Sequence, residues 1–392
     1  MYYYSQRLSW SFSSNSLTQL LIRKRAAGTP LLDLTISNPT KCLPEYPHEA
    51  IRRAFGQTQE FTYYPDPFGS EIARSAVTEY YRERGISVTP HQLLLTASTS
   101  EAYSQLFKLL CDPGDEVLAP LPSYPLFEYL AALESVRMTP YRLRYDGTWH
   151  LDFASLRAQI NRRTKAIIVV NPNNPTGTYL NAEEQSELLH VAKQFSLPVI
   201  SDEVFTDYAV MPRAQTARTF AGNHSALSFS LNGLSKTAGM PQMKLAWIAI
   251  SGPAQEQQDA RERLETIADT YLSVGTPVQH VLTNLLQIGA NIRQQLLQRI
   301  KENLAVIDNL LKGTALQRLH LDGGWSAILR LPRVMTEEDW VRGLLQEQDT
   351  IAQPGYFFDM ESEAYMVLSL ITPIDQFRAG IERICCHVSR YS

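Results

Sequence analysis

The sequence predicts an α/β protein with a large domain, in which helices cover a seven-stranded and mainly parallel sheet, and a smaller α+β domain. Two observations support this fold class. From about residue 48 to residue 280, helical stretches alternate with short apolar segments, the pattern of parallel strands joined by helical crossovers. Segments such as Ala166–Val170 and Leu245–Ile250 are almost continuously apolar, as strands are when helices cover both faces of their sheet.

The chain begins with a polar and aromatic segment, residues 1–30, in which Leu17–Ala27 is predicted as a helix that ends at Gly28. A short strand, Leu31–Ile36, follows. The helices predicted for the large domain are Glu49–Gln57, Ser70–Glu83, Glu101–Cys111, Leu126–Leu133, Asp152–Ile160 and Asn181–Phe195. Its predicted strands are Leu93–Thr96, Glu116–Ala119, Val136–Pro140, Ala166–Val170, Val199–Ser201, Ala226–Leu231 and Leu245–Ile250.

After Pro277 the pattern changes, and we predict a smaller domain built from residues 281–392 together with residues 1–47, with residues 48–280 forming the large domain. The inclusion of the N-terminal residues is an expectation by analogy. The elements predicted here are a long helical stretch Val278–Leu311, apolar segments Leu316–His320 and Trp325–Leu331, a helix Glu337–Gln346, a strand near Tyr365–Leu370 and a last helix Pro373–Val388.

Composition and charge argue against several classes of protein. The chain has 392 residues, of which 44% are hydrophobic and 19% charged, and its net charge of −4 gives no reason to expect nucleic acid or an anionic membrane as a partner. No apolar run approaches the roughly 18 residues that a membrane span needs. We expect a cytoplasmic protein, because the first residues contain no apolar signal core. The sequence has four cysteines, Cys42, Cys111, Cys385 and Cys386. Their spacing fits no metal site, so we expect reduced thiols and no bound metal.

One lysine lies at the centre of a loop between two predicted strands. Lys236 follows Ala226–Leu231 and precedes Leu245–Ile250. Desolvation in partly apolar surroundings lowers the pKa of a lysine, and a neutral amine can attack an aldehyde and hold it as a Schiff base. Taken alone, a solvated loop lysine is the commoner alternative.

Polar groups follow two more strands at the same predicted sheet edge. Ser98 and Thr99 begin a helix after the strand Leu93–Thr96, where free backbone N–H groups can bind an anion; an ordinary helix cap is the alternative. Tyr124 follows the next strand on a proline-rich turn and could stack on a flat cofactor, or it could be a core aromatic.

The segment Asn171–Gly177, NPNNPTG, is a stronger signal. Its prolines make a stiff turn from which amide side chains such as that of Asn174 can reach a ligand, and the bond from Asn174 to Pro175 is a candidate cis bond. A turn without a binding role is the alternative. Further on, a buried strand ends in two carboxylates, Asp202 and Glu203, and we expect one of them to point into the sheet crevice. A buried Asp there can pair with a protonated ring nitrogen, and helix capping is the alternative for either acid.

Together these motifs resemble a fold-type I pyridoxal-phosphate enzyme of the class I/II aminotransferase family. The resemblance runs from Asp33 to the last helix. It rests on Tyr64-Pro-Asp-Pro-Phe-Gly69 with Arg74, on Asn171–Gly177, on Asp202-Glu-Val and on Ser235-Lys236-Thr. It implies pyridoxal 5'-phosphate as the cofactor and the fold-type I architecture.

The resemblance also implies roles for individual residues. Lys236 would hold the cofactor as a Schiff base and shuttle the proton during catalysis. Asp202 would pair with the pyridinium nitrogen, Asn174 would donate to the ring phenolate, and Tyr124 would stack on the ring.

The cofactor phosphate would be held by backbone groups at Ser98 and Thr99, with Ser235 and Lys244. Tyr64 is similar to a tyrosine that reaches the phosphate from the neighbouring subunit. The resemblance therefore implies a homodimer with shared active sites.

Four positions depart from the family pattern. Phe205 stands where a tyrosine usually donates to the phenolate, Lys244 where an arginine is usual, and Ser37 where a glycine is usual. Val367 occupies the place of the arginine that clamps the substrate α-carboxylate. Arg330 and Arg378, in the same predicted domain, are the candidates to replace it.

We therefore predict an aminotransferase that moves an amino group between an amino acid, or a related amine, and a keto acid. The alternative is a lyase, cyclase or epimerase on an amino acid derivative, because the fold alone does not separate these outcomes. A cofactor-sensing regulator is a third hypothesis, which would usually need an appended nucleic-acid-binding segment.

Overall fold

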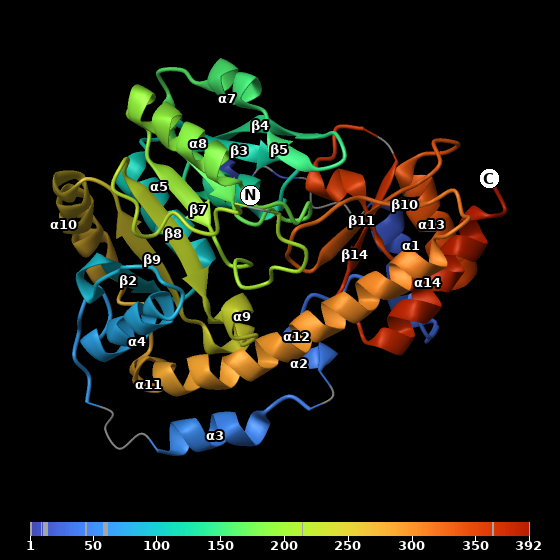
Figure 1. Ribbon diagram of the computed structural model, residues 1–392, viewed down its shortest axis with the longest axis horizontal. Helices are drawn as coiled ribbons and strands as arrows, with labels where there is room; N and C mark the ends of the chain where they lie inside the picture. The colour runs from blue at the N-terminus through green and yellow to red at the C-terminus, as the bar shows by residue number, and fades with distance from the viewer. Residues whose placement is uncertain are drawn as a thin grey trace.

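The structure is a computed structural model in which residues 2–8, 10, 15–43, 45–57, 62–213, 215–362 and 364–391 are described. Figure 1 shows a large sheet with helices packed around it on one side and a smaller group of strands and helices on the other. The helix α12 (Leu282–Leu310) runs along the molecule between them.

The large sheet contains eight strands among the described residues: β2 (Leu93–Thr96), β3 (Glu116–Leu121), β4 (Arg137–Tyr145), β5 (Trp149–Leu151), β6 (Thr164–Val170), β7 (Val199–Asp202), β8 (Ser228–Gly233) and β9 (Ala246–Ser251). Their order is β2-β9-β8-β7-β6-β3-β4-β5, and all run the same way except β9 and β5. The seven predicted strands are present and the sheet is mainly parallel, as predicted. The additional strand, β5, was not predicted, because three residues are too few to show a period.

Burial on both faces explains why the central strands are continuously apolar. In β6, Ile168 belongs to a hydrophobic cluster with residues of α5 (Thr99–Leu110) and α10 (Ala254–Tyr271). Its neighbour Ile167 belongs to a different cluster with residues of α8 (Ala182–Phe195). Successive side chains of a strand point to opposite faces, so helices on both sides of the sheet require apolar residues at every position.

The smaller group contains a four-stranded antiparallel sheet in the order β10-β11-β14-β13. Its strands are β10 (Gln317–Arg318), β11 (Ser326–Arg330), β13 (Gln353–Pro354) and β14 (Tyr365–Ser369), and its C-terminal helices are α13 (Glu337–Gln348) and α14 (Ile374–Val388). The N-terminal segment joins this group, because β1 (Leu32–Asp33) pairs with β12 (Thr350–Ile351) and α1 (Ser16–Ala26) packs against α13. The predicted domain boundaries remain a prediction.

The remaining helices are α2 (Pro39–Cys42), α3 (His48–Gly56), α4 (Glu71–Arg82), α6 (Leu126–Leu133), α7 (Phe153–Gln159), α9 (Leu234–Thr237) and α11 (Thr276–His280). The predicted stretch Val278–Leu311 spans two helices, α11 and α12. The helix α10 was not predicted, because its long sequence is polar and buries only Ala260, Leu264 and Ala268.

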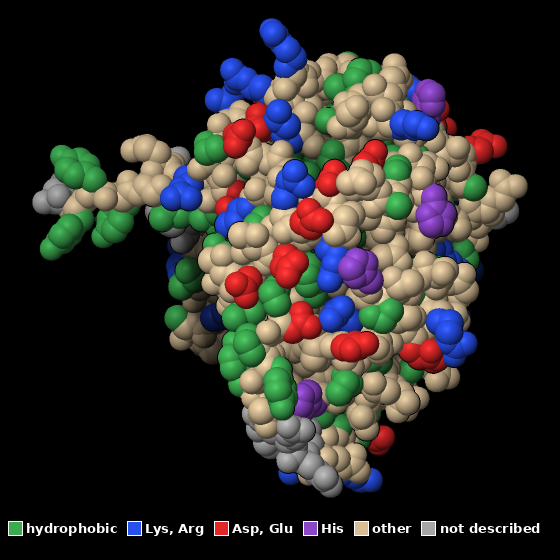
Figure 2. Space-filling model, turned by 90° about the vertical axis from the view of Figure 1, so that its left-hand side faces the viewer, with side chains coloured by type: hydrophobic (Ala, Val, Ile, Leu, Met, Phe, Trp, Pro, Cys, Tyr) green, Lys and Arg blue, Asp and Glu red, His purple; other side chains and the backbone are tan. Residues whose placement is uncertain are grey.

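On the face shown in Figure 2, acidic and basic side chains are interspersed, and neither sign forms a continuous stripe. No helix in the described part of the chain is both long enough and apolar enough to cross a bilayer.

Candidate active site

A cavity of about 280 Å³ lies at the edge of the large sheet where its parallel strands end. Nine of the ten predicted site residues line it: Ser98, Thr99, Tyr124, Asn174, Asp202, Phe205, Ser235, Lys236 and Lys244. They come from the segments that follow β2, β3, β6, β7 and β8 and from the loop before β9. Because the carboxyl ends of parallel strands meet at one edge, distant parts of the sequence are brought together there.

Lys236 lies in the one-turn helix α9, directly after β8, and its amine is in apolar surroundings. The Nζ atom is 5.2 Å from the ring centroid of Trp325 and 6.0 Å from that of Phe205. Burial lowers the pKa of the Lys236 amine, and the negative charge of Asp202 opposes this shift. A larger fraction of neutral amine is therefore present than for an exposed lysine, as attack on an aldehyde requires.

The backbone around Lys236 is fixed from two sides. The Tyr208 hydroxyl donates a 2.7 Å hydrogen bond to the Lys236 carbonyl, and Arg293 Nη1 donates a 2.8 Å bond to the Thr237 carbonyl. Gly289 of α12 approaches so closely that an added Cβ would lie 2.4 Å from the Cβ of Ala238. These contacts fix the backbone from which the Lys236 side chain extends into the cavity.

Asp202 ends β7 and is 8% exposed. Its carboxylate accepts 3.2 Å hydrogen bonds from the Tyr103 hydroxyl and from the Val204 backbone N–H. Burial raises the pKa of Asp202 to about 6, even though these bonds and Lys236 favour the charged form. The site thus holds a carboxylate that a cationic ring nitrogen would stabilise.

An anion cradle lies at the start of α5. The Ser98 Oγ atom accepts a 3.1 Å bond from the Glu101 N–H, so the helix cap that was the alternative to an anion site is present. The backbone N–H groups of Thr99 and Ser100 have no acceptor among the described residues. Lys244, which has a left-handed backbone with φ of 51°, lines the same cavity. Free N–H groups at a helix start beside a lysine suit a phosphate.

Asn174, Tyr124 and Phe205 line the same cavity. The bond from Asn174 to Pro175 is cis, as predicted, and the Asn174 Oδ1 atom accepts a 3.1 Å bond from Ser326 Oγ. Tyr124 is 46% exposed, which rules out the core-aromatic alternative for this residue. Phe205 is buried, and its ring centroid lies 4.9 Å from that of Trp325.

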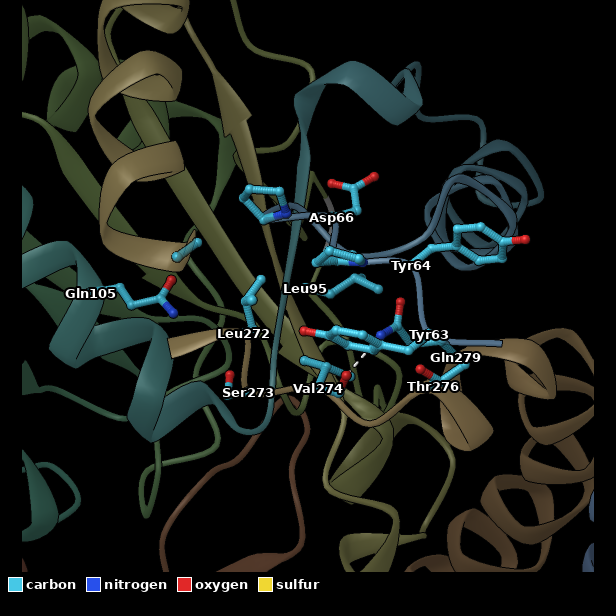
Figure 3. Close-up of a pocket in the computed structure, with 14 residues that line it drawn as sticks. Tyr63, Tyr64, Asp66, Leu95, Gln105, Leu272, Ser273, Val274, Thr276 and Gln279 are labelled. Carbon is cyan, nitrogen blue, oxygen red and sulfur yellow. Dashed lines mark hydrogen bonds between the residues drawn. The ribbon is translucent and has the colours of Figure 1, made fainter. Parts of the chain in front are cut away.

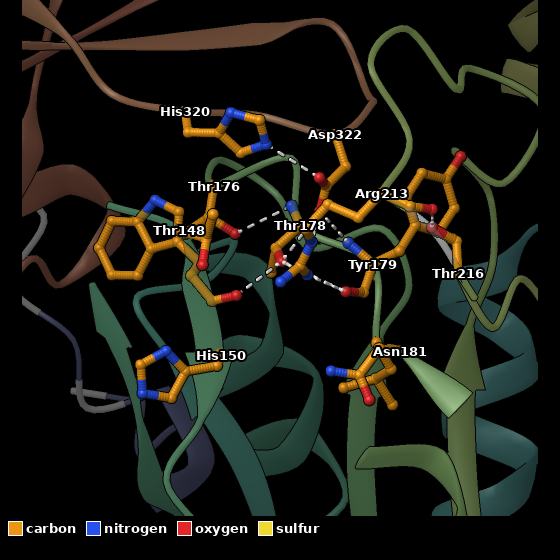
Figure 4. A network of polar contacts seen from close by, with 12 residues as sticks. Thr148, His150, Thr176, Thr178, Tyr179, Asn181, Arg213, Thr216, His320 and Asp322 are labelled. Carbon is orange, nitrogen blue, oxygen red and sulfur yellow. Dashed lines mark hydrogen bonds and ion pairs between the residues drawn. The ribbon is translucent and has the colours of Figure 1, made fainter. Parts of the chain in front are cut away.

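The loop that carries Asn174 is clamped by the segment before β11 (Figure 4). Asp322 Oδ2 accepts bonds from Arg213 Nε at 3.1 Å and from the Tyr179 N–H at 3.2 Å. The Gly323 N–H donates a 2.8 Å bond to the Gly177 carbonyl, and a Cβ on Gly177 would lie 2.4 Å from the Gly323 carbonyl oxygen. Glycine is needed at position 177 for this close approach.

Tyr64 does not line this cavity. It is 72% exposed and lies at a second cavity beside Tyr63, Leu95 and Gln279. In Figure 3 the ring of Tyr63 reaches across that second cavity, whereas the ring of Tyr64 points away from it. The predicted role of Tyr64 in a neighbouring subunit's site therefore remains a prediction.

Sequence reasoning missed three residues of the cavity or its support. Tyr103 lies one helical turn after Thr99, so helical periodicity could have placed it on the face of the helix that carries Thr99. Trp325 follows Gly323 and Gly324, and glycines at such a position indicate a close approach of two backbone segments. Tyr208 binds the Lys236 backbone, and no sequence signal marked it.

The residues of the cavity fit pyridoxal 5'-phosphate. The buried amine can hold an aldehyde, the buried carboxylate with its raised pKa can take a ring nitrogen, the exposed ring of Tyr124 can stack, and the unpartnered N–H groups can hold a phosphate.

Comparisons with known proteins agree with this arrangement. The chain matches the family described as "Aminotransferase class I and II" over residues 29–373. It is 26% identical over 380 residues to the glutamate-pyruvate aminotransferase AlaA of Haemophilus influenzae, covering 94% of this chain and 93% of that protein. It is 31% identical over 264 residues to an alanine aminotransferase of Mycobacterium tuberculosis, covering 66% and 61% of the two chains.

Solved structures share the fold. An alanine aminotransferase from Pyrococcus furiosus has a TM-score of 0.87 at 24% identity, with 99% of this chain and 100% of that chain covered. An aminotransferase from Escherichia coli has a TM-score of 0.86 at 22% identity, with coverages of 100% and 99%. The chain belongs to the class I and II aminotransferase family and is a pyridoxal-phosphate-dependent aminotransferase.

Proposed function

We propose that this aminotransferase binds its cofactor covalently through Lys236. Asp202 would pair with the ring nitrogen, Asn174 would donate to the ring phenolate oxygen, and Tyr124 would stack on the ring. The observation that carries this proposal is the single cavity that joins a mostly buried amine to a buried carboxylate at the strand ends.

The phosphate end of the site is proposed to use Ser98, Thr99, Ser235 and Lys244, all of which line the cavity. The lysine at position 244 supplies a point charge to the phosphate, whereas an arginine would supply a planar fork of donors. We therefore expect the phosphate to be held largely by the backbone N–H groups at the start of α5.

When bound, pyridoxal phosphate supplies an electron-withdrawing ring that acidifies the C–H bond beside the substrate amino group. Once the donor's amino group has displaced it, the Lys236 Nζ atom would take this proton and pass it on, and water would release the donor as its carbonyl product. The carboxylate of Asp202 would keep a counter-charge at the ring nitrogen. Trp325 and Phe205 exclude water from the space around the amine.

The substrates are an amino acid or related amine as the donor and a keto acid as the acceptor. We further propose a homodimer in which Tyr64 reaches the partner's phosphate site, because this exposed tyrosine lies outside the cavity of its own chain. A cytoplasmic location is also proposed. The four cysteines are free, which fits a reducing compartment.

A half-reaction screen tests the proposed reaction. The purified protein is mixed with single amino donors in the absence of an acceptor, and the cofactor and products are analysed. Conversion of the cofactor to its aminated form, with one equivalent of carbonyl product, supports transamination. Ammonia or a cyclised product with the cofactor unchanged would instead support a lyase or cyclase.

A further inference from the structure

The positive charges that line the cavity are few. Within the described residues, its lining contains two cations, Lys236 and Lys244, and no arginine. In the proposed function, Lys236 bonds to the cofactor and Lys244 contacts the phosphate. No cationic side chain of this chain's cavity is then left for a carboxylate on the substrate.

The antiparallel sheet of the smaller group supplies no cationic side chain for a substrate carboxylate at the cavity. Ser326 pairs with Ser369 and Ile328 with Val367, so these four side chains share one face, and Ser326 contacts Asn174 of the cavity. Val367 is 1% exposed and lies in an apolar cluster with Ile328. The residues of this face nearest the cavity are therefore hydroxyl-bearing or aliphatic.

The two candidate arginines do not reach the cavity. Arg330 lies on β11 four residues beyond Ser326, a distance of roughly 13 Å along a strand, and its Nη1 atom donates to Gln317 at 3.2 Å. Arg378 is exposed on α14 and does not line the cavity.

Aromatic and aliphatic side chains line the part of the cavity around the Lys236 amine, where the donor must bind. The rings of Phe205 and Trp325 lie edge to face at 74° beside the Lys236 Nζ atom, and Leu126 and Phe127 also line the cavity. Such walls favour an apolar group on the donor, because its burial removes apolar surface from water. The walls provide no counter-charge for a carboxylate, whose desolvation is costly when it is unpaired.

We propose that the site selects its donor by an apolar group and does not require a carboxylate on the reacting carbon. Primary amines without that carboxylate are then substrates alongside amino acids. This inference rests on the proposed function. An amine RR'CH–NH2 and the cofactor aldehyde give the ketone or aldehyde RR'C=O and the aminated cofactor, so that the C–N bond of the donor breaks and all atoms balance.

Matched ligand pairs test this proposal on the holoenzyme. Phenylalanine and 2-phenylethylamine differ only in the carboxylate, as do valine and isobutylamine. Saturation of single-turnover spectra gives a dissociation constant for each donor. Calorimetry with two unreactive ligands, 3-phenylpropanoate and 3-phenylpropan-1-ol, gives a comparison that needs no catalysis.

A charge-assisted bidentate clamp contributes on the order of 10- to 100-fold to binding. We expect the two members of each pair to bind within about tenfold of one another, since no such clamp lines the cavity. The proposal would be overturned if, in either measurement, the carboxylate-bearing member of a pair bound more than about tenfold tighter than the member without it. This holds whether the cation that binds the carboxylate comes from this chain or from a neighbouring subunit. Failure of every donor to aminate the cofactor would count against the proposed function, while the calorimetric ratio would still decide this inference.

A Lys244→Gln variant provides the control for the second lysine. We expect it to release the cofactor more readily. At saturating cofactor, the ratio of the dissociation constants of 3-phenylpropanoate and 3-phenylpropan-1-ol should stay within about threefold of the wild-type ratio. A selective loss of carboxylate binding of about tenfold would identify Lys244 as a carboxylate ligand and would contradict the proposal.

Discussion

Replacing Asp202 by asparagine should make the cofactor-free protein more stable above pH 7 and weaken its hold on pyridoxal phosphate. The carboxyl is 8% exposed, and burial raises its pKa from 3.8 to about 6. One pKa unit corresponds to about 1.36 kcal/mol, so the charged form costs the folded protein about 3 kcal/mol. An asparagine carries no charge and can still accept a bond from Tyr103 or Val204.

The sign of the pH dependence follows from the direction of the shift. A carboxyl with a raised folded-state pKa contributes stability that is complete below pH 3.8 and is lost as the pH rises through 6. Of this stabilisation of about 3 kcal/mol, roughly 1.5 kcal/mol is lost between pH 5 and pH 8. Urea unfolding of the cofactor-free protein is practicable in this pH range. The difference in unfolding free energy between the variant and the wild type should grow by that amount over this range.

Cofactor binding should change in the opposite direction. Loss of a charged partner for the ring nitrogen should raise the dissociation constant of pyridoxal phosphate about 10- to 100-fold. Glu203→Gln is the matched control: burial raises the pKa of Glu203 to about 7, but this residue bonds Ser230 and Phe220 and does not line the cavity. It should show a larger pH-dependent gain, about 2.5 kcal/mol between pH 5 and pH 8, with unchanged cofactor affinity. A pH-independent stability difference for Asp202→Asn, or unchanged cofactor affinity, would refute the reasoning.

Two further substitutions probe the surroundings of Lys236. Phe205→Tyr should move the pH titration of the bound cofactor's visible absorbance to lower pH, because a hydroxyl that donates to the phenolate stabilises its charged form; an unmoved titration would mean that position 205 is not beside the ring. Gly289→Ala should lower the unfolding free energy by about 1 to 3 kcal/mol in urea titrations, because its Cβ would lie 2.4 Å from the Cβ of Ala238. Gly56→Ala, with nothing within 4 Å, should be neutral or stabilising by up to about 1 kcal/mol, and equal losses for both variants would argue against the close packing.

The sheet was predictable from the sequence because each central strand is buried on both faces. That burial makes segments such as Ala166–Val170 continuously apolar, a pattern that a sequence shows directly. The strand β5 and the helix α10 escaped prediction for opposite reasons. The strand is only three residues long, whereas the helix buries so few side chains that its apolar stripe is faint.

The site was predictable where a residue followed a strand and belonged to a distinctive motif. Lys236, Asp202 and Asn174 all meet these conditions, and all three line one cavity. Residues that act through tertiary contacts gave no such signal: Tyr208 reaches the Lys236 carbonyl from another loop, and Arg293 reaches Thr237 from α12. Such contacts depend on how helices pack, which a local pattern does not encode.

The most direct test of the account is the position of the covalent bond to the cofactor. The holoenzyme is reduced with borohydride, digested, and its cofactor-bearing peptide is identified by mass spectrometry. We expect the adduct on Lys236 alone, and a Lys236→Ala variant that still binds the cofactor but yields no adduct. An adduct on Lys244, or any adduct in the variant, would contradict the assignment of the amine and the roles of the groups placed around it.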